Sequence, residues 1–316
     1  MTDQKAKDIY KGNLAPIPCV FDGKGEPDLP MMEQLVDFYL NAGVHGFFVL
    51  GSQGQGAATT IEQRKAVAET VVKRVDKRVP IILQVGAVDP YTSIELASHA
   101  KEIGSDAIGL VGPYYYSDRS EWELIEQHKQ VDAAAGLPML LYNNPQYSGY
   151  PTPPAMMKKL KEAIPNVFGS KLADGSLGQA KTYLRAMGED FVVFVPITQM
   201  IPGMLVGING SIASGAPVTI PEAGVALVEA IWAGDYERAL KIQVLLIEYG
   251  DRTAVLRQYG RRTTVEGLRI RGLEVKEYPR WTTREMSSEH LKYYETCITE
   301  VLDDLAELTP KAVAAE

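Results

Sequence analysis

Short apolar runs alternate along the chain with segments whose apolar residues have helical spacing. The apolar runs are nearly continuous, which is typical of parallel strands covered on both faces. The runs interpreted as strands are residues 14–21, 46–50, 81–86, 107–112, 138–143, 167–172, 191–195 and 210–214. The segments interpreted as helices are residues 31–42, 61–78, 92–103, 121–135, 154–163, 177–187, 200–206 and 221–233. The order of strand and helix therefore repeats eight times.

Eight strand–helix units predict an α/β fold, a closed (β/α)8 TIM barrel, for which about 250 residues is the usual size. We expect the barrel to span residues 1–234 and to carry the active site. Residues 235–316 are predicted to form a C-terminal helical region. One apolar helix face there consists of Leu240, Val244, Leu245 and Ile247, and residues 288–308 provide another.

Composition narrows the function classes. The chain has 316 residues, of which 46% are hydrophobic, so it can bury a substantial core. Its net charge of −8 argues against a nucleic-acid surface, which normally needs a basic excess. The polar first residues and the lack of a long apolar window predict a cytoplasmic protein without a membrane segment. The two cysteines lie far apart in the sequence, which suits reduced thiols.

The stretch "VLGSQGQGAATT", residues 49–60, follows the second apolar run and contains three glycines. Such turns expose backbone N–H groups that can bind an anion. The order Gly51, Gly54, Gly56 matches neither the dinucleotide fingerprint nor a P-loop, which needs a following Lys-Ser/Thr pair. A smaller anion such as a carboxylate remains open, and so does a tight strand-to-helix turn without a ligand.

Lys171 lies inside the apolar run 167–172. A lysine within a barrel strand must desolvate its ammonium or become a neutral amine, and a neutral amine attacks carbonyls to form a Schiff base. Tyr142, at the end of the preceding strand, can transfer protons if a hydroxyl such as that of Ser52 tunes its pKa. The alternatives are a lysine that reaches solvent between helices and a tyrosine that only packs. Together these residues indicate imine chemistry on a 2-oxo acid such as pyruvate, with its carboxylate bound after the second strand.

Four motifs in order carry a resemblance to a known family. They are Gly51-Ser52-Gln53-Gly54-Gln55, Pro113-Tyr114-Tyr115, Tyr142-Asn143-Asn144-Pro145, and the lysine motif from Lys171 to Gly175. Over nearly its whole length the chain resembles the dihydrodipicolinate synthase and N-acetylneuraminate lyase family of class I, pyruvate-dependent aldolases. The resemblance implies covalent chemistry on a lysine, without a metal or redox cofactor.

The resemblance also implies roles for individual residues. Lys171 would be the Schiff-base lysine and Tyr142 the proton shuttle. Ser52 would link Tyr142 to Tyr115, which a neighbouring subunit supplies in family members. The backbone carbonyl of Ile212 would lie near the imine. Family members are commonly tetramers built as dimers of dimers, so the C-terminal region is expected in an interface between subunits.

The sequence departs from the family pattern at the substrate end. Synthase members carry an arginine where this chain has Tyr147, which disfavours dihydrodipicolinate synthase activity, and Gln53 and Gln55 replace the usual Thr and Glu. The glycine-rich loop without Glu makes the chain more similar to the branch of 2-keto-3-deoxy sugar-acid aldolases. Residues expected to bind substrate are Gly51, Gln53, Gly54 and Ile212, with Asn144, Tyr147, Asp174 and Thr198 at the aldehyde end. Because none of the last four is a cation, the prediction is a neutral polyol or aromatic aldehyde, with the polar side chains favouring a sugar-derived one.

The favoured activity is thus a lyase that forms or cleaves a 4-hydroxy-2-oxo acid from pyruvate and an aldehyde. Three alternatives stay open: a Schiff-base dehydratase or hydratase-aldolase, the disfavoured synthase, and a non-catalytic protein that binds 2-oxo acids. No metal site is expected, because the histidines show no ligand spacing. They are His45, His99, His128 and His290. The sequence leaves open the identity of the aldehyde, the physiological direction, and whether the oligomer is a dimer or a tetramer.

Overall fold

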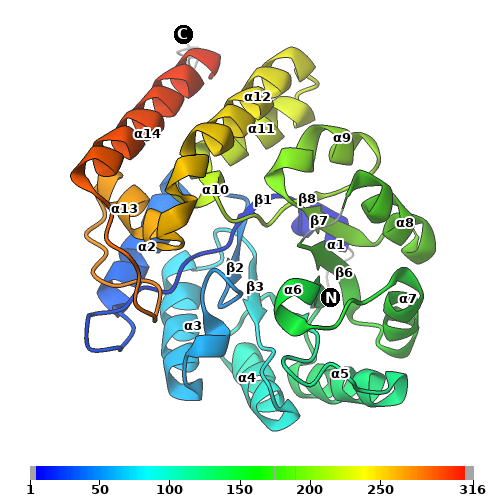
Figure 1. The fold of residues 1–316 in the computed structure, drawn as a ribbon. Coiled ribbons are helices and arrows are strands. Elements are labelled where there is room, and N and C mark those ends of the chain that lie inside the picture. Colours follow the sequence, from blue (N-terminus) through cyan, green and yellow to red (C-terminus); the bar gives the residue numbers. More distant parts are fainter. Residues whose placement is uncertain (1–4, 174–175, 189, 310–316) are drawn as a thin grey trace.

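The computed structural model describes residues 5–173, 176–188 and 190–309, and it shows a closed barrel of eight parallel strands (Figure 1). Each strand pairs with its neighbours in chain order, and β1 closes the barrel against β8. The strands are β1 (Gly12–Ala15), β2 (Gly46–Val49), β3 (Ile81–Gln84), β4 (Ala107–Val111), β5 (Met139–Asn143), β6 (Val167–Leu172), β7 (Val192–Val195) and β8 (Gly210–Ser211). The predicted (β/α)8 barrel is confirmed.

Helices surround the barrel and connect successive strands (Figure 1). The eight that correspond to the predicted segments are α2 (Leu29–Asn41), α3 (Ile61–Val75), α4 (Pro90–Glu102), α5 (Glu121–Ala135), α7 (Pro154–Ala163), α8 (Leu177–Met187), α9 (Met200–Leu205) and α11 (Pro221–Trp232). Short additional turns are α1 (Ala6–Ile9), α6 (Pro145–Ser148), α10 (Ala216–Thr219), η1 (Gly56–Ala58) and η2 (Ile197–Gln199). Helix α3 begins with a capping box between Thr60 and Gln63, which satisfies backbone donors at its first turn.

Most strands are one or two residues shorter than predicted, and two, β1 and β8, differ by more. Residues 14–21 were expected to form one strand, but β1 ends at Ala15. Pro16 and Pro18 follow, and a proline has no N–H to donate to a strand ladder. The predicted strand 210–214 is reduced to two residues, where β8 approaches β1 so closely that a Cβ on Gly210 would lie 2.0 Å from the carbonyl oxygen of Gly12.

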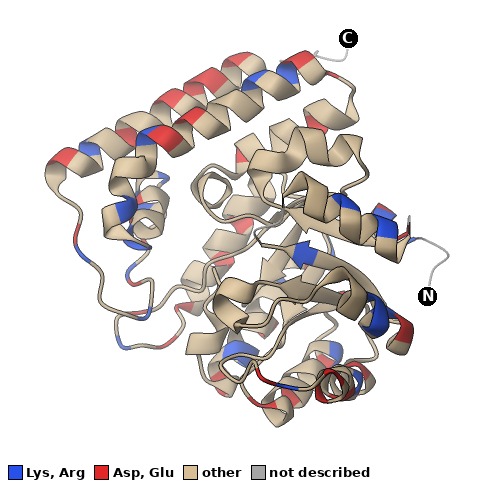
Figure 2. Cartoon of the chain, turned by 45° about the vertical axis from the view of Figure 1, so that its right-hand side comes forward, with Lys and Arg blue, Asp and Glu red and all other residues tan. Residues whose placement is uncertain are grey.

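The register of the barrel brings the chemically important side chains together. Tyr142 on β5 pairs with Lys171 on β6, and Lys171 pairs with Phe194 on β7. Lys171 is the one Lys, Arg, Asp or Glu in strands β1–β8, whereas charged residues elsewhere colour the helices and connections (Figure 2). Beneath it the barrel interior is filled by apolar side chains that include Leu14, Phe48 and Ile82. These side chains close the barrel interior below Lys171, and the carboxyl ends of the strands are where barrel enzymes place their active sites.

The C-terminal region is helical, as predicted. It contains α12 (Tyr236–Arg252), η3 (Thr253–Tyr259), α13 (Arg262–Ile270) and α14 (Ser288–Leu308). Helices α12 and α14 lie side by side (Figure 1), and Tyr249 donates a hydrogen bond of 3.2 Å to Tyr294 between them. None of the helices that the structure describes has the length and apolar content needed to cross a membrane.

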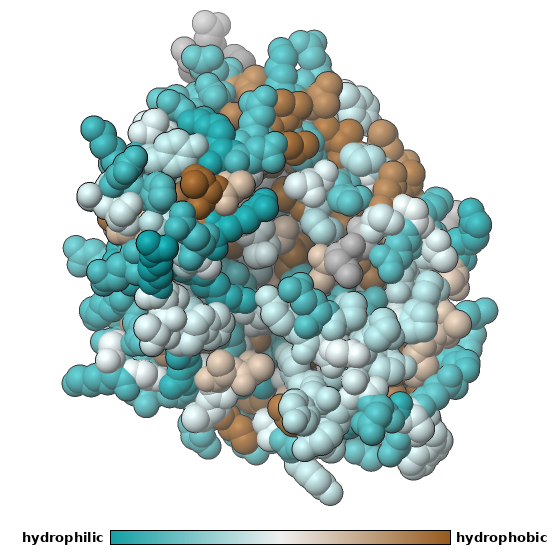
Figure 3. Space-filling model, in the orientation of Figure 1, coloured by the Kyte–Doolittle hydropathy of each residue, from teal (hydrophilic) through white to brown (hydrophobic). Residues whose placement is uncertain are grey.

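The segment between α13 and α14 returns to the barrel. Phe21 forms an antiparallel bridge with Glu277, and Tyr278 donates a hydrogen bond of 2.9 Å to the carbonyl oxygen of Gln53. The C-terminal region thus packs against the loop that follows β2. Its outer face keeps exposed apolar side chains at Leu240 and Val244 of α12, and hydrophobic surface is visible in this part of the molecule (Figure 3). The division of the chain at residue 234 stays a prediction.

Candidate active site

A cavity of about 190 Å³ lies at the carboxyl ends of the strands, where several predicted site residues converge. Lys171 and Tyr142 come from adjacent strands, while Ser52 and Gln53 come from the loop after β2. Among the predicted site residues, those that line it are Ser52, Gln53, Tyr142, Asn144, Tyr147, Lys171 and Ile212. The barrel thus brings together groups that are up to 160 positions apart in the sequence, since Ser52 and Ile212 meet at one cavity.

Lys171 is buried, with 7% of its surface exposed, and its amine lies over two aromatic rings. The Nζ atom is 4.2 Å from the ring centroid of Tyr142 and 4.6 Å from that of Phe48. In the described part of the chain, no carboxylate lies within 4.0 Å of this nitrogen. A primary amine held this way, free of a salt bridge and facing a cavity, is available to a carbonyl carbon.

The Tyr142 hydroxyl lies at the centre of a small group of hydrogen bonds. Its hydroxyl forms a hydrogen bond of 3.0 Å with Ser52 Oγ, and Asn144 Nδ2 donates one of 2.8 Å to it. Burial acts to raise the pKa of Tyr142, but the positive charge of Lys171 and the hydrogen bonds from Ser52 and Asn144 outweigh burial, so the pKa lies below its ordinary value. A phenol with a lowered pKa beside an amine is suited to proton transfer near that amine.

The loop after β2 is a tight turn that leaves backbone donors unused. A Cβ on Gly56 would lie 2.2 Å from the Leu50 carbonyl oxygen, and one on Gly54 would lie 2.8 Å from the Leu50 backbone. The glycines are therefore required by close packing of the backbone. Within the described residues, no hydrogen bond is found from the backbone N–H groups of Ser52 and Gln53. Two adjacent free N–H groups beside the cavity can donate hydrogen bonds to a carboxylate.

Arg261 is a site residue that sequence reasoning missed. It lies immediately before α13 and lines the same cavity as Lys171. Its Nη1 donates hydrogen bonds of 2.9 Å to the Ser52 carbonyl oxygen and 2.7 Å to the Tyr278 hydroxyl. Burial acts against the charged form, but the phenols of Tyr278 and Tyr147 outweigh it and raise the pKa of Arg261. The cavity therefore contains a fixed guanidinium.

The presence of Arg261 removes the premise behind the predicted neutral aldehyde, namely that no cation reaches this end of the site. The arginine comes from the sequence "YGRRTTVEG", which lies in the C-terminal region and has no motif that marks a binding residue. Only the return of this region onto the loop after β2 places it beside Tyr147. A sequence signal was absent because the contact spans the two parts of the chain.

The remaining predicted residues occupy several different places. Gly51 and Gly54 are buried in the turn and do not line the cavity, so they act through the backbone shape. Tyr115 has a left-handed backbone, with φ of 63°, and 85% of its surface is exposed, well outside the cavity of its own chain. Asp174 lies outside the described residues. Thr198 lines a neighbouring cavity instead.

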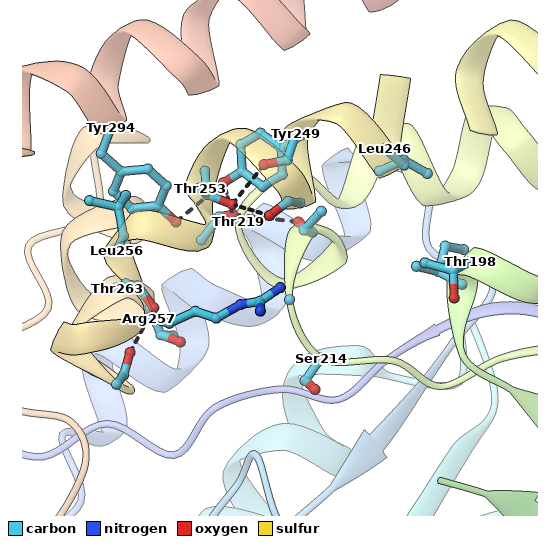
Figure 4. Close-up of a pocket in the computed structure, with 16 residues that line it drawn as sticks. Thr198, Ser214, Thr219, Leu246, Tyr249, Thr253, Leu256, Arg257, Thr263 and Tyr294 are labelled. Atoms are coloured by element: carbon cyan, nitrogen blue, oxygen red, sulfur yellow. Dashed lines mark hydrogen bonds between the residues drawn. The ribbon is translucent and has the colours of Figure 1, made fainter. Parts of the chain in front are cut away.

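The neighbouring cavity has a volume of about 420 Å³ and lies between the loops after β7 and β8 and the C-terminal helices (Figure 4). Its polar lining consists largely of hydroxyl groups, including those of Thr198, Thr219 and Tyr249. Arg257 extends into it from η3 (Figure 4). Ser214 lines both cavities, so the two are adjacent.

With this geometry established, comparison with known proteins identifies the family. The model of the Dihydrodipicolinate synthetase family matches residues 10–301. The chain belongs to this family. It is 30% identical over 244 residues to "Putative 2-dehydro-3-deoxy-D-gluconate aldolase YagE" of Escherichia coli (strain K12), which covers 76% of this chain and 80% of YagE. It is 32% identical over 244 residues to a 4-hydroxy-tetrahydrodipicolinate synthase of Alkaliphilus oremlandii (strain OhILAs), over 77% of this chain and 83% of the synthase.

Solved structures of the family have the same fold. The crystal structure of YagE from E. coli K12 in complex with pyruvate superimposes with a TM-score of 0.84 at 26% identity, covering 93% of this chain and 99% of YagE. Ruminococcus gnavus sialic acid aldolase gives a TM-score of 0.87 at 25% identity, covering 95% and 99%. The protein is accordingly an enzyme, a carbon–carbon lyase of the pyruvate-dependent class I aldolase type. Across the described ranges, no group of three or more His, Cys, Asp or Glu is arranged to hold a metal ion.

Proposed function

We propose that the protein forms and cleaves a 4-hydroxy-2-oxo acid through an imine on Lys171, with a 2-keto-3-deoxy sugar acid as the substrate class. The observation that carries the proposal is the position of the Lys171 amine, 4.2 Å from the ring of Tyr142, whose hydroxyl is hydrogen-bonded to Ser52 and Asn144. An amine and a proton-transfer group in one small cavity are the two groups that this reaction needs.

The first step is attack of the Lys171 amine on the carbonyl carbon C2 of the 2-oxo acid. The N–C bond forms, the oxygen leaves as water after two proton transfers, and a protonated imine remains on Nζ. The carboxylate next to C2 binds the free backbone N–H groups of Ser52 and Gln53.

In the second step Tyr142 accepts the proton of the substrate's 4-hydroxyl. The C3–C4 bond breaks, its electron pair moves into the imine to give an enamine, and C4 leaves as an aldehyde. Protonation of the enamine at C3 and hydrolysis of the imine release pyruvate and restore the amine. Ser52 and Asn144 stabilise the phenolate of Tyr142 between these proton transfers, in line with its lowered pKa.

The substrate class rests on the polar lining and on the relatives. Asn144 and Gln146 line the cavity, and the hydroxyl-rich second cavity adjoins it at Ser214. Curated relatives include proteins named as aldolases of 2-dehydro-3-deoxy sugar acids. A hydroxylated substrate could therefore form hydrogen bonds with polar side chains along this side of the barrel.

The experiment that tests the proposal is trapping of the imine. The protein is incubated with pyruvate and borohydride, digested, and examined by mass spectrometry, with Lys171→Ala as the matched control. We expect one reduced adduct, on the peptide that contains Lys171, and none in the variant. A folded wild-type protein without an adduct would overturn the proposal.

Product analysis then separates the proposed reaction from its alternatives. An aldolase releases pyruvate and an aldehyde from a 2-keto-3-deoxy sugar acid, whereas a dehydratase releases water and a new oxo acid from the same compound. A synthase would instead condense pyruvate with aspartate semialdehyde. Liquid chromatography with mass detection distinguishes these products in one assay.

We further propose a cytoplasmic homotetramer built as a dimer of dimers, in which Tyr115 reaches the site of a second copy. The support is the exposure of two neighbouring aromatic side chains beside the barrel mouth. Tyr115 has 85% of its surface exposed, and Tyr116 is exposed as well. Analytical ultracentrifugation of the wild type tests the oligomer. A monomer at micromolar concentration with full activity would contradict it.

A further inference from the structure

We infer that residues 261–280, here called the support segment, hold the loop after β2 in the position that binds the 2-oxo acid, with Tyr278 as the central positioning residue. This inference rests on the proposed function, because it concerns the same site. It adds a role for a residue that lies outside the set of described residues lining the cavity.

Two consecutive carbonyl groups of the loop accept hydrogen bonds from the support segment. Arg261 Nη1 donates one of 2.9 Å to the carbonyl oxygen of Ser52, and the Tyr278 hydroxyl donates one of 2.9 Å to that of Gln53. Arg261 Nη1 also donates to the Tyr278 hydroxyl over 2.7 Å, so one connected group of donors holds both carbonyls. A side-chain hydrogen bond with Tyr147 connects Arg261 to the loop after β5 as well.

The positions at which this loop departs from the family motif lie at the same contact. Gln53 Nε2 donates a hydrogen bond of 3.4 Å to Thr264 Oγ1 on α13, and Gln55 Oε1 accepts one of 3.0 Å from the backbone N–H of Arg280. Arg280 Nη1 also donates one of 3.1 Å to the carbonyl oxygen of Ala58. The two glutamines that replace the usual Thr and Glu therefore both contact the support segment.

Holding the carbonyl groups also orients backbone N–H groups. A trans peptide unit is planar, and its C=O and N–H point in opposite directions. The carbonyl of Ser52 and the N–H of Gln53 belong to one such unit, and this N–H is one of the two that have no hydrogen bond within the described residues. The hydrogen bond from Arg261 therefore fixes a donor that the proposed function assigns to the carboxylate of the substrate.

The same loop carries the hydroxyl that contacts the proton-transfer group. Ser52 Oγ lies 3.0 Å from the Tyr142 hydroxyl, so the position of the loop also sets this distance. A displacement of about 1 Å at a reacting group can lower a rate by about 100-fold. A shift of the loop is thus expected to weaken the binding of the 2-oxo acid and to slow proton transfer together.

The contact is buried, which makes the loop depend on it. Tyr278 has 2% of its surface exposed and Gln53 has 7%. Water has little access to replace a lost partner there, and an unpaired buried carbonyl costs more than an exposed one. Loss of the Tyr278 hydroxyl therefore favours a displaced loop.

The support segment is itself attached to the barrel. It passes beside α2 and α3 (Figure 1), where Lys276 Nζ lies 2.9 Å from a carboxylate oxygen of Asp28 and Arg280 Nη1 donates a hydrogen bond of 2.6 Å to Gln63 Oε1. Because it is fixed to both helices, the segment can restrain the loop instead of moving with it.

The test compares Tyr278→Phe with the wild type. The variant keeps the ring and loses the hydroxyl between Arg261 and the Gln53 carbonyl. We expect the pyruvate concentration for half-maximal borohydride trapping on Lys171 to rise about 3- to 10-fold, and kcat for cleavage to fall about 10-fold. Hydrogen–deuterium exchange, followed by mass spectrometry in the peptide that covers residues 50–60, should become faster.

A matched control is Tyr10→Phe. The Tyr10 hydroxyl is also buried and donates a hydrogen bond of 2.9 Å to a backbone carbonyl, that of Asp106, but it precedes β1 at the opposite end of the barrel. Trapping and kcat should change less than about 2-fold in this variant, and exchange in residues 50–60 should stay unchanged. Equal changes in the two variants would show a general loss of stability and overturn the inference.

A double variant shows whether Tyr278 acts through the loop. If it does, Tyr278→Phe lowers kcat by less than about 2-fold further when Ser52→Ala is already present, because both substitutions disturb the same group. Effects on kcat that multiply in full would contradict the inference.

Arg280→Ala takes the place of Tyr278→Phe if that variant does not fold. It removes the side-chain hydrogen bond to the Ala58 carbonyl and keeps the backbone N–H that holds Gln55. It should change trapping, kcat and exchange in the same directions, with about a 2- to 5-fold effect on trapping and kcat.

The measurements separate this inference from the proposed function. If the wild type forms no imine with pyruvate, the proposed function fails, and the exchange of residues 50–60 still shows whether Tyr278 holds the loop. If the wild type forms the imine and a folded Tyr278→Phe binds pyruvate and turns over as the wild type does, the proposed function stands and the inference is wrong.

Discussion

The two adjacent cavities at the mouth of the barrel differ in what builds them. In the lysine cavity Lys171 and Tyr142 lie on strands, and Tyr142 forms hydrogen bonds with Ser52 and Asn144, which lie just after strands. In the neighbouring cavity, more than twice as large, the walls come from loops and C-terminal helices, and the side chain of Arg257 has no hydrogen bond or ion pair within the described residues.

This difference indicates that the two cavities have different functions. Groups fixed by a barrel strand and by mutual hydrogen bonds keep the geometry that a reaction needs, because each side chain is held within a narrow range of positions. Groups on helices around a roomy cavity can accept substrates of different length. We therefore expect substitutions of Lys171, Tyr142 and Ser52 to change the rate, and substitution of Thr198 in the neighbouring cavity to change the binding of longer substrates.

The largest effect is expected for Lys171→Arg. The variant keeps a positive charge beside Tyr142, but a guanidinium does not form the imine, so turnover should fall by about 10⁴-fold or more, as when a nucleophile is removed. The measurement is pyruvate release, with circular dichroism and thermal melting as controls for folding. Retained activity in a folded variant would show that the charge, and not the amine, is what this cavity contributes.

The next effect is that of Tyr142→Phe. Loss of the hydroxyl removes the proton acceptor but leaves the amine and the aromatic ring, so kcat should fall about 10²- to 10⁴-fold. Borohydride trapping should still label Lys171. If trapping disappears together with turnover, Tyr142 is needed for imine formation as well as for cleavage.

A smaller effect, with a specific pH signature, is expected for Ser52→Ala. The hydrogen bond from Ser52 contributes to the lowered pKa of Tyr142, so its removal raises that pKa. Because the deprotonated phenol accepts the proton during cleavage, activity rises as the pH passes upward through this pKa, and the variant's rising limb should move to higher pH. We expect about a 10-fold loss of kcat at neutral pH, and a profile of kcat against pH provides the check.

A second variant controls for packing at this position. Ser52→Thr keeps a hydroxyl, so its kcat should rise at the same pH as that of the wild type. If kcat rises at the same pH in Ser52→Ala as in the wild type, Ser52 does not influence the pKa of Tyr142, even if the rate itself changes.

The smallest effect is expected for Thr198→Val, in the neighbouring cavity. The two side chains have similar shape, and Thr198 does not touch the lysine cavity, so kcat for a short aldehyde should change less than about 2-fold. For a six-carbon 2-keto-3-deoxy acid, KM should rise by several-fold through loss of one hydrogen bond. A large fall in kcat for both substrates would contradict the division between the two cavities.

Much of the catalytic centre could be predicted from the sequence. A lysine inside an apolar run is conspicuous, and the strand–helix repeat places the ends of all eight strands at one edge of the barrel. Tyr142 and Lys171 are therefore neighbours by register, which the pairing of β5 with β6 confirms. The boundaries of β1 and β8 were less accurate, because prolines and a close backbone contact shorten those strands.

The substrate end was predicted less well. Thr198 follows a strand, as Tyr142 does, yet it lines a different cavity. The length and course of a loop after the strand decide where such a residue points, and these depend on packing against other elements. Arg261 could not be found at all, since it reaches the site from beyond the barrel.

The sequence by itself determined the barrel and the lysine in one of its strands, because both follow from local patterns: the period of apolar residues and one charge in an apolar strand. Tertiary structure alone decided that Arg261 lines the cavity that contains Lys171. The C-terminal region packs back onto the loop after β2, and the hydrogen bonds of Arg261 to Ser52 and Tyr278 form only in that packed state. Contacts between distant segments depend on the whole fold and leave no periodic signal in the chain.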